Sequence, residues 1–272
     1  ASWDANTLYL HQGIFEGEHE EHHASALFGM AIPLVPNAAQ GPPLALYLDV
    51  GVPDASVDVR QNYIPYRIPD VLEEWLESSI LGGGLSETSF SWRGGFKGFG
   101  SGLQSLQIAT VISDGSIKFQ TDWPRIDDFE GALLVDTDRV SVWGRQGSIS
   151  DAIVEGVSVE VDAARTAGEL LASGQFRGEG TAALNLLRHS PIYNATSALL
   201  DDLELEGFVT GDLELAMDIR PPAAPPQVAV ATELSKAKVR SRPLALTLED
   251  VEGGLDFNSE TGFRGRNLQS TL

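Results

Sequence analysis

The sequence predicts a mainly β protein, folded as a long antiparallel meander with one or two short helices. Three observations predict this class. Apolar residues alternate with polar ones in many short runs, turn residues separate the runs, and only two segments have helical spacing. In the best run, Leu213, Leu215 and Met217 share one face while Asp212 and Glu214 take the other. A sheet of such strands has one apolar face and one wet face.

The alternation recurs along most of the chain. Each run is short enough to be one strand, and neighbouring runs follow one another closely. The runs lie at 44–52, 106–112, 117–119, 157–161, 203–205, 213–219 and 244–248. Strands this close in sequence are expected to pair with their sequence neighbours.

Turn chemistry separates the runs. The sequence predicts turns at Asp114-Gly115, Asp136-Thr137-Asp138, Gly147-Ser148, Gly207 and Gly253-Gly254, because Asp and Gly tolerate the backbone conformations that tight turns require. The strands are therefore expected to form successive hairpins.

A pattern resembling 126–133 returns at 248–255, which is 248 − 126 = 122 residues later. In both segments, two acidic residues are followed by an apolar residue, a glutamate and a glycine. The repetition predicts that one type of strand entry is used twice.

Two segments break the alternation. Helical spacing predicts a helix at about 69–81, with Gly82-Gly83-Gly84 as its stop, and a short helix at about 182–189, ended by Ser190-Pro191. No composition change marks a domain boundary. We expect residues 1–272 to form one continuous β segment, with the two helices as interruptions.

Composition excludes several classes of protein. The chain has 18 Lys and Arg against 39 Asp and Glu, a net charge of −21, and a surface this negative repels nucleic acid. It has no cysteine, which excludes disulfides and thiolate chemistry. No apolar run reaches the roughly 18 residues of a membrane-spanning helix. Because the sequence starts at Ala1 without a methionine, we expect a segment of a longer protein.

No group of residues signals catalysis. The run Glu18-His19-Glu20-Glu21-His22-His23 contains potential metal ligands, but its spacing matches no known metal motif, and a solvated charged loop explains it better. His11 and His189 have no nucleophile motif beside them, and the chain contains no Gly-x-Ser-x-Gly sequence. We therefore expect no enzyme activity, no metal and no cofactor.

The apolar face of such a sheet must be covered. With few helices available, the sheet either folds on itself as a closed sandwich or stays open as a trough that holds lipid. The alternation does not distinguish these two folds. A lipid conduit and a closed β-sandwich that serves as an envelope scaffold or adhesion module are both compatible with it.

Several motifs in series resemble one family. The order and spacing are followed from about Leu46 to Arg266, and each motif is short. The motifs are Tyr63-Ile64-Pro65, Trp75-Leu76, Phe90-Ser91-Trp92-Arg93-Gly94, Ser113-Asp114-Gly115-Ser116-Ile117, Trp123-Pro124, Leu187-Arg188-His189-Ser190-Pro191 and Asp250-Val251-Glu252-Gly253. Together they resemble the YhdP family of AsmA-like, bridge-like lipid transfer proteins of the cell envelope.

The resemblance implies an open, curved β-groove, shaped like a taco, in the periplasmic region of a protein anchored to the inner membrane. Its partners would be phospholipid acyl chains, and the inner and outer membranes through parts of the chain outside this segment. Nucleic acid is not an expected partner. Phospholipids would move between the two membranes along the groove, without catalysis.

The candidate groove residues are apolar residues of the alternating runs. They are Leu46, Leu48, Leu106, Ile108, Ile112, Ile117, Phe119, Leu133, Val135, Val140, Val142, Val157, Val159, Leu213, Leu215, Met217 and Leu246. Each is expected to face the apolar side of the sheet.

Overall fold

A computed structural model gives the fold of the chain. It describes residues 1–4, 6–19, 22–34, 44–57, 78–95, 104–118, 123–162, 168–190, 193, 201–218 and 224–271. In this part of the chain, 14 strands form one sheet, and a single helix of more than one turn, α2, accompanies it. The protein is therefore mainly β, as its alternating sequence predicts.

The strands are mostly long, between 10 and 16 residues, apart from the two-residue first strand. They are β1 Ser2–Trp3, β2 Thr7–His19, β3 His22–Pro33, β4 Ala45–Ser56, β5 Ile80–Gly95, β6 Ser105–Ile117, β7 Ile126–Asp136, β8 Arg139–Ile149, β9 Ala152–Asp162, β10 Glu169–Glu179, β11 Leu203–Asp218, β12 Gln227–Ser241, β13 Leu246–Asn258 and β14 Gly262–Thr271. Helix α2 spans Gly180–Arg188 between β10 and β11.

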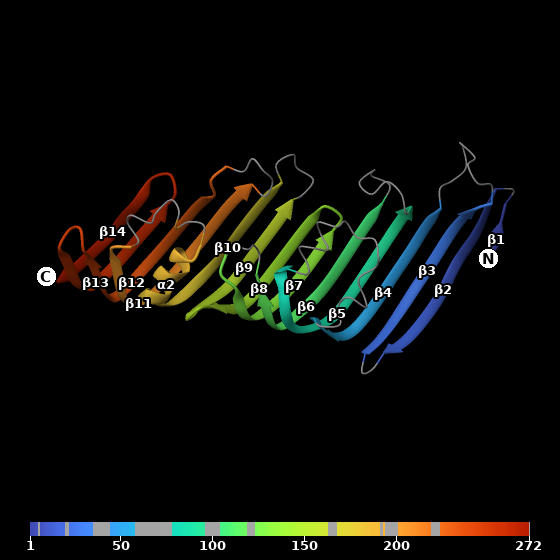
Figure 1. Cartoon of the computed structure of the whole chain (residues 1–272), viewed down its shortest axis with the longest axis horizontal. Helices are drawn as coiled ribbons and strands as arrows, with labels where there is room; N and C mark the ends of the chain where they lie inside the picture. Colours follow the sequence, from blue (N-terminus) through green and yellow to red (C-terminus); the bar gives the residue numbers. More distant parts are fainter. Residues whose placement is uncertain are drawn as a thin grey trace.

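Each strand pairs with its neighbours in the sequence, so the strand order runs from β1 to β14 without a crossover. All the pairs are antiparallel. The first and last strands lie at opposite ends of the molecule (Figure 1). The sheet is an open meander, and the alternative of a closed β-sandwich is wrong.

Several predicted turns are β-bulges inside strands. Asp136 to Arg139 is a true turn between β7 and β8. In contrast, Asp114-Gly115 lies within β6, Gly207 within β11 and Gly253-Gly254 within β13, next to shifts in strand register. The prediction was wrong here because a left-handed residue serves a bulge as well as it serves a turn.

The bulges recur from strand to strand. Their left-handed residues have φ between 48° and 96°, and adjacent bulges touch: a Cβ on Gly207 would lie 3.0 Å from the Lys236 carbonyl oxygen. These residues are Glu87 in β5, Asp114 in β6, Asp128 in β7, Gly156 in β9, Gly207 in β11, Lys236 in β12, Asp250 in β13 and Asn267 in β14. Because each bulge bends its strand, their repetition curves the whole sheet.

The bulges also explain the internal repeat. Asp128 and Asp250 occupy equivalent places in the two similar segments, and both have a left-handed backbone, with φ of 51° and 49°. Asp adopts this conformation more readily than most residues. The repeated pattern is thus a bulge used twice.

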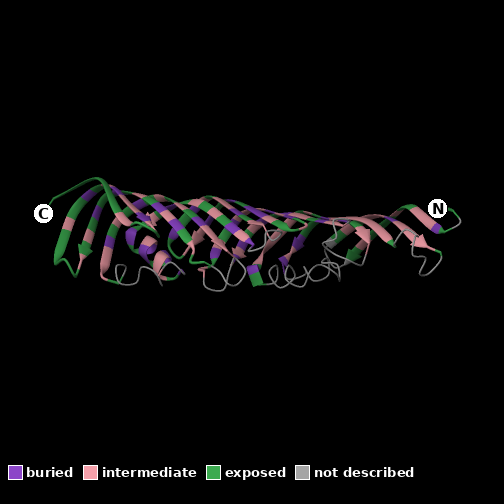
Figure 2. Ribbon diagram, turned by 90° about the horizontal axis from the view of Figure 1, so that it is seen from above, coloured by how far each residue is buried: buried purple, intermediate pink, exposed green. Residues whose placement is uncertain are grey.

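The two faces of the sheet differ in chemistry. On one face, Leu106, Phe129 and Val135 are 0% exposed and belong to a continuous apolar cluster. On the other face, ion pairs join neighbouring strands, such as Arg177 with Glu155 at 2.7 Å. Figure 2 shows the alternation of buried and exposed residues across the arching sheet, with the helix beneath its concave side. We call the apolar side the inner face.

Helix α2 confirms the prediction of a short helix at about 182–189, beginning two residues earlier. Ala182 and Leu186, four residues apart, share one side of the helix and are buried, and Leu184 is buried as well. The backbone N–H of His189 donates to the Asn185 carbonyl at 3.0 Å and closes the last turn.

The prediction of a helix at 69–81 falls mainly outside the described residues. Of its described residues, Ser78 and Ser79 are helical as predicted, whereas Ile80 and Leu81 belong to strand β5, and so does the expected glycine stop at 82–84. Three consecutive glycines are compatible with a strand here because Gly82 and Gly84 pair with β6. In the described residues, no helix has the length and apolar character needed to cross a bilayer.

The left-handed backbone at Asp250 predicts a residue-specific effect on stability. Asp250→Val should lower the free energy of unfolding by about 1–2 kcal/mol, because a β-branched side chain is strained at positive φ. Asp250→Gly should leave it unchanged or raise it. Urea denaturation measures both, with Thr247→Val, which has no positive φ, as the control. Equal stability of the Val and Gly variants would contradict a left-handed bulge.

The last strand predicts a pH effect. Arg266 of β14 donates to both carboxylate oxygens of Asp256 in β13, at 2.5 and 3.0 Å, and this hydrogen bonding lowers the pKa of Asp256 below its ordinary 3.8. The ionised carboxylate therefore stabilises the strand pair at neutral pH. This stabilisation is lost as the pH falls through the lowered pKa.

Asp256→Asn should speed amide hydrogen exchange in β14 at pH 7. The difference from the unmodified chain should shrink as the pH falls below about 3.8, the pKa of an unperturbed aspartate. A difference that stays constant across this range would show that the ion pair does not hold β14.

Candidate functional site

Apolar side chains form a continuous row across the inner face. Residues directly opposite in an antiparallel pair point to the same face, with Cβ atoms about 5 Å apart. From β6 to β12 the pairing links Thr110, Leu133, Val142, Val159, Ala172, Leu215 and Val228 in one unbroken series. Seven neighbouring strands thus contribute one side chain each, and only Thr110 carries a polar atom.

A second row runs beside the first, two residues away along most of the strands. It begins at β4 and ends at β11. The pairing links Val50, Phe90, Ile108, Val135, Val140, Val161, Leu170 and Met217. We call these two rows together the groove floor. The strands lie side by side along the length of the molecule (Figure 1), so rows that cross from strand to strand run along that length.

Most predicted groove residues lie on this inner face. Among them, Leu106, Ile112, Ile117, Leu133, Val135, Val142, Val159 and Leu215 are buried, whereas Leu46, Leu48, Ile108, Val140, Val157, Leu213 and Met217 are partly exposed and pack against the buried ones. The partly exposed residues offer apolar surface to a ligand. Leu246 keeps the inner-face register, through its pairing with Ser241 and that of Ser241 with Leu203, but it is 37% exposed and outside the cluster. Phe119 lies outside the described residues.

Aromatic residues of the inner face escaped the sequence prediction. Phe129 is 0% exposed, and its ring fills the space above two paired glycines: a Cβ on Gly131 of its own strand would lie 2.6 Å from that ring, and a Cβ on Gly144 of β8 would lie still closer to it. Phe176 covers Gly211 in the same way. Phe129 follows the bulge at Asp128, which breaks the alternation by one residue. Paired glycines beside an aromatic residue are the signal that identifies these positions.

Two hollows open on the inner face, on either side of α2. The first measures about 800 Å³, including space open to solvent, and Trp123, Val157, Ala172 and Met217 contribute to its lining. The second measures about 580 Å³ on the same basis. Leu203, Val230, Leu255, Phe257 and Phe263 contribute to its lining. Both are lined mainly by apolar side chains.

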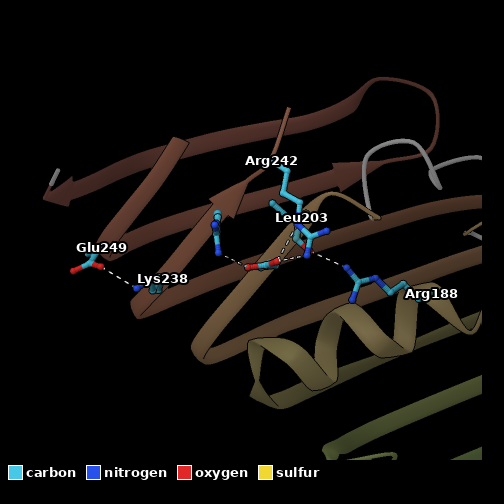
Figure 3. A network of polar contacts seen from close by, with 7 residues as sticks. Arg188, Leu203, Lys238, Arg242 and Glu249 are labelled. Carbon is cyan, nitrogen blue, oxygen red and sulfur yellow. Dashed lines mark hydrogen bonds and ion pairs between the residues drawn. The ribbon is translucent and has the colours of Figure 1, made fainter. Parts of the chain in front are cut away.

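No buried side chain among the described residues carries a charge. In the described part of the chain, every buried polar side chain is a serine or a threonine. At the rim, Arg188 at the end of α2 donates to the Leu203 carbonyl oxygen at 2.8 Å (Figure 3). Groups of this kind hold α2 and β11 together without placing a charge on the floor.

The polar network continues on the outer face. Glu204 accepts hydrogen bonds from Arg242 at 2.6 Å and from Arg240 at 3.5 Å (Figure 3). Hydrogen bonding from Arg242 is the main cause of the lowered pKa of Glu204. Because Leu203 and Leu205 belong to the inner cluster, the intervening Glu204 points away from it. The network ties β11 to β12 and leaves the floor uncharged.

The described histidines make local contacts with neighbouring residues. The imidazole Nδ1 of His189 lies 2.8 Å from the Asn185 carbonyl oxygen at the end of α2, and His11 contacts Ser2 at the sheet edge. Glu18 and His23 face each other at the hairpin of β2 and β3, 3.3 Å apart and exposed. Residues 20–21 and the side chains of His19 and His22 lie outside the described residues. No described His, Asp and Glu side chains gather into a metal-binding group.

Comparison with known proteins gives a match to one family model. No curated protein and no solved structure matches the chain. The family model of the YhdP protein matches residues 13–272, and so extends the resemblance seen from Leu46 to Arg266 toward the start of the chain. The match covers nearly the whole chain and all strands from β3 to β14. This chain is a member of the YhdP family.

Proposed function

We propose that this chain is a segment of a periplasmic lipid-transport bridge, in which phospholipids move between the inner and outer membranes along the groove floor. The observation that carries the proposal is the floor itself. Its two rows of paired side chains continue without interruption over strands β6 to β11, and no buried charge interrupts them in the described residues.

Acyl chains fit the chemistry of this surface. Removing a methylene group from water contributes about 0.8 kcal/mol, so a chain lying on the floor is stabilised by contact with apolar side chains alone. Partly exposed residues such as Ile108, Val140 and Met217 provide this contact. The phosphate headgroup stays in solvent at the open side of the sheet. This arrangement avoids the cost of burying a charge.

The absence of strong local contacts also allows a lipid to move along the groove floor. Each pair of carbon atoms contributes only about 0.1–0.2 kcal/mol, so no single residue holds the chain in place. Neighbouring strands repeat the same kind of side chain about every 5 Å along the floor. A lipid that shifts by one strand therefore exchanges one set of contacts for an equivalent set.

The wider setting belongs to the full-length protein. There the segment lies in the periplasm, and the protein is anchored to the inner membrane and reaches the outer membrane through other parts of its chain. Family membership supports this setting. The bridge works without catalysis and without a cofactor. Its partners are the two membranes and the acyl chains of their phospholipids.

A charge on the floor should block the passage of lipid. Ile108→Asp places a carboxylate in the second row, and an acyl chain cannot solvate it, so the cost of passing is several kcal/mol. Lipid transport by the full-length protein between donor and acceptor vesicles should fall about tenfold or more, since 1.4 kcal/mol corresponds to a factor of ten.

Val111→Asp is the matched control. Val111 is a β-branched residue of the same strand, β6, but it pairs with Ala132 on the outer face and is 39% exposed. This variant should transport lipid normally. Equal transport by the Ile108→Asp and Val111→Asp proteins, both folded by circular dichroism, would favour a scaffold without lipid transport over a conduit.

A further inference from the structure

Helix α2 lies across the inner face and packs on two strands of the floor. Its chain leaves β10 directly, without a connecting loop, and the helix contacts β10 and β11. Ala182, Leu184 and Leu186 are 3%, 4% and 8% exposed, so the helix covers the floor beneath it. It thus occupies space that an acyl chain would otherwise take.

Both ends of α2 are fixed to β11. At its start, a Cβ on Gly180 would lie 2.9 Å from the Leu205 carbonyl oxygen, so the backbones are in close contact. At its end, Arg188 donates to the Leu203 carbonyl oxygen at 2.8 Å. A helix held at both ends over buried leucines is a fixed part of the groove.

The hollows on the two sides of α2 share a wall. Leu186 of α2 lines both of them, together with Phe176 and Leu213 beneath it. Their other walls differ. Trp123, Val157 and Met217 belong only to the first hollow, whereas Leu203, Leu255 and Phe263 belong only to the second.

We propose that α2 divides the inner face into two separate acyl-chain sites, one over β8–β11 and one over β11–β14. The inference rests on the proposed function and deepens it. Each site takes one alkyl chain, because each is a hollow lined mainly by apolar side chains. Leu186, Phe176 and Leu213 form the wall that the two hollows share. A lipid that passes this point leaves one site before it enters the other.

A photoreactive fatty acid tests the division. The probe is a palmitic acid analogue that carries a diazirine, irradiated with the purified chain and mapped by mass spectrometry of its peptides. Two separate groups of labelled peptides should appear, one containing Val157 or Met217 and the other containing Leu255 or Phe263. The outer-face residue Leu171, which is 43% exposed, should remain unlabelled.

A larger side chain in one hollow should exclude the fatty acid from that hollow and leave its binding in the other unchanged. Met217→Trp should reduce labelling in the first site about tenfold and leave the second within twofold of the unmodified chain. Leu255→Trp should do the reverse. Val157→Trp and Phe263→Trp, the latter a smaller change of volume, are the second variants for the two sites, and circular dichroism identifies any that fail to fold.

The outcomes separate this inference from the proposed function. If each variant lowers labelling on both sides of α2 in parallel, the two hollows form one site and the division is wrong, while the conduit stands. If the unmodified chain is not labelled on its inner face at all, both proposals fall.

Discussion

The fold depends on one constraint: every strand keeps its apolar residues in register with those of both neighbours. A shift of one residue in any strand would turn its apolar side chains to solvent. The register of the described strands keeps Leu133, Val142 and Val159 opposite one another over three strands. This alignment produces the apolar floor and, at the same time, sends the ion pairs such as Arg177 with Glu155 to the outer face.

The bulges reconcile this alignment with curvature. A bulge adds a residue to one strand, which would reverse the faces beyond it if the neighbouring strand ran on regularly. Here neighbouring strands carry bulges at adjoining places, such as Gly207 beside Lys236, so the faces stay matched on both sides. The sheet bends into an arch with its apolar face inward (Figure 2). Helix α2 then fills part of the concave side, where its Leu184 and Leu186 side chains are buried.

The sequence predicts much of this structure. The physical reasons for this success also explain which features the sequence does not predict. Alternation alone places Leu133, Val142 and Leu215 on one face, because the period of a strand is two. It cannot separate a turn from a bulge at Asp114-Gly115, since the same left-handed residue suits both and only the partner strand differs. It misses Phe129 because the bulge at Asp128 shifts the pattern. It also cannot place α2 over the floor, which depends on contacts with β11 that are distant in sequence.

Site-specific photocrosslinking tests the central claim most directly, that one face of this sheet carries acyl chains. A photoreactive amino acid is placed in the full-length protein in living cells, either at Val157 or at its neighbour Ser158. Val157 packs on the inner cluster, whereas Ser158 pairs with Trp143 and Ser173 on the outer face. Our account predicts phospholipid adducts at Val157 and none at Ser158. Equal adducts at both positions, or adducts at Ser158 alone, would contradict it.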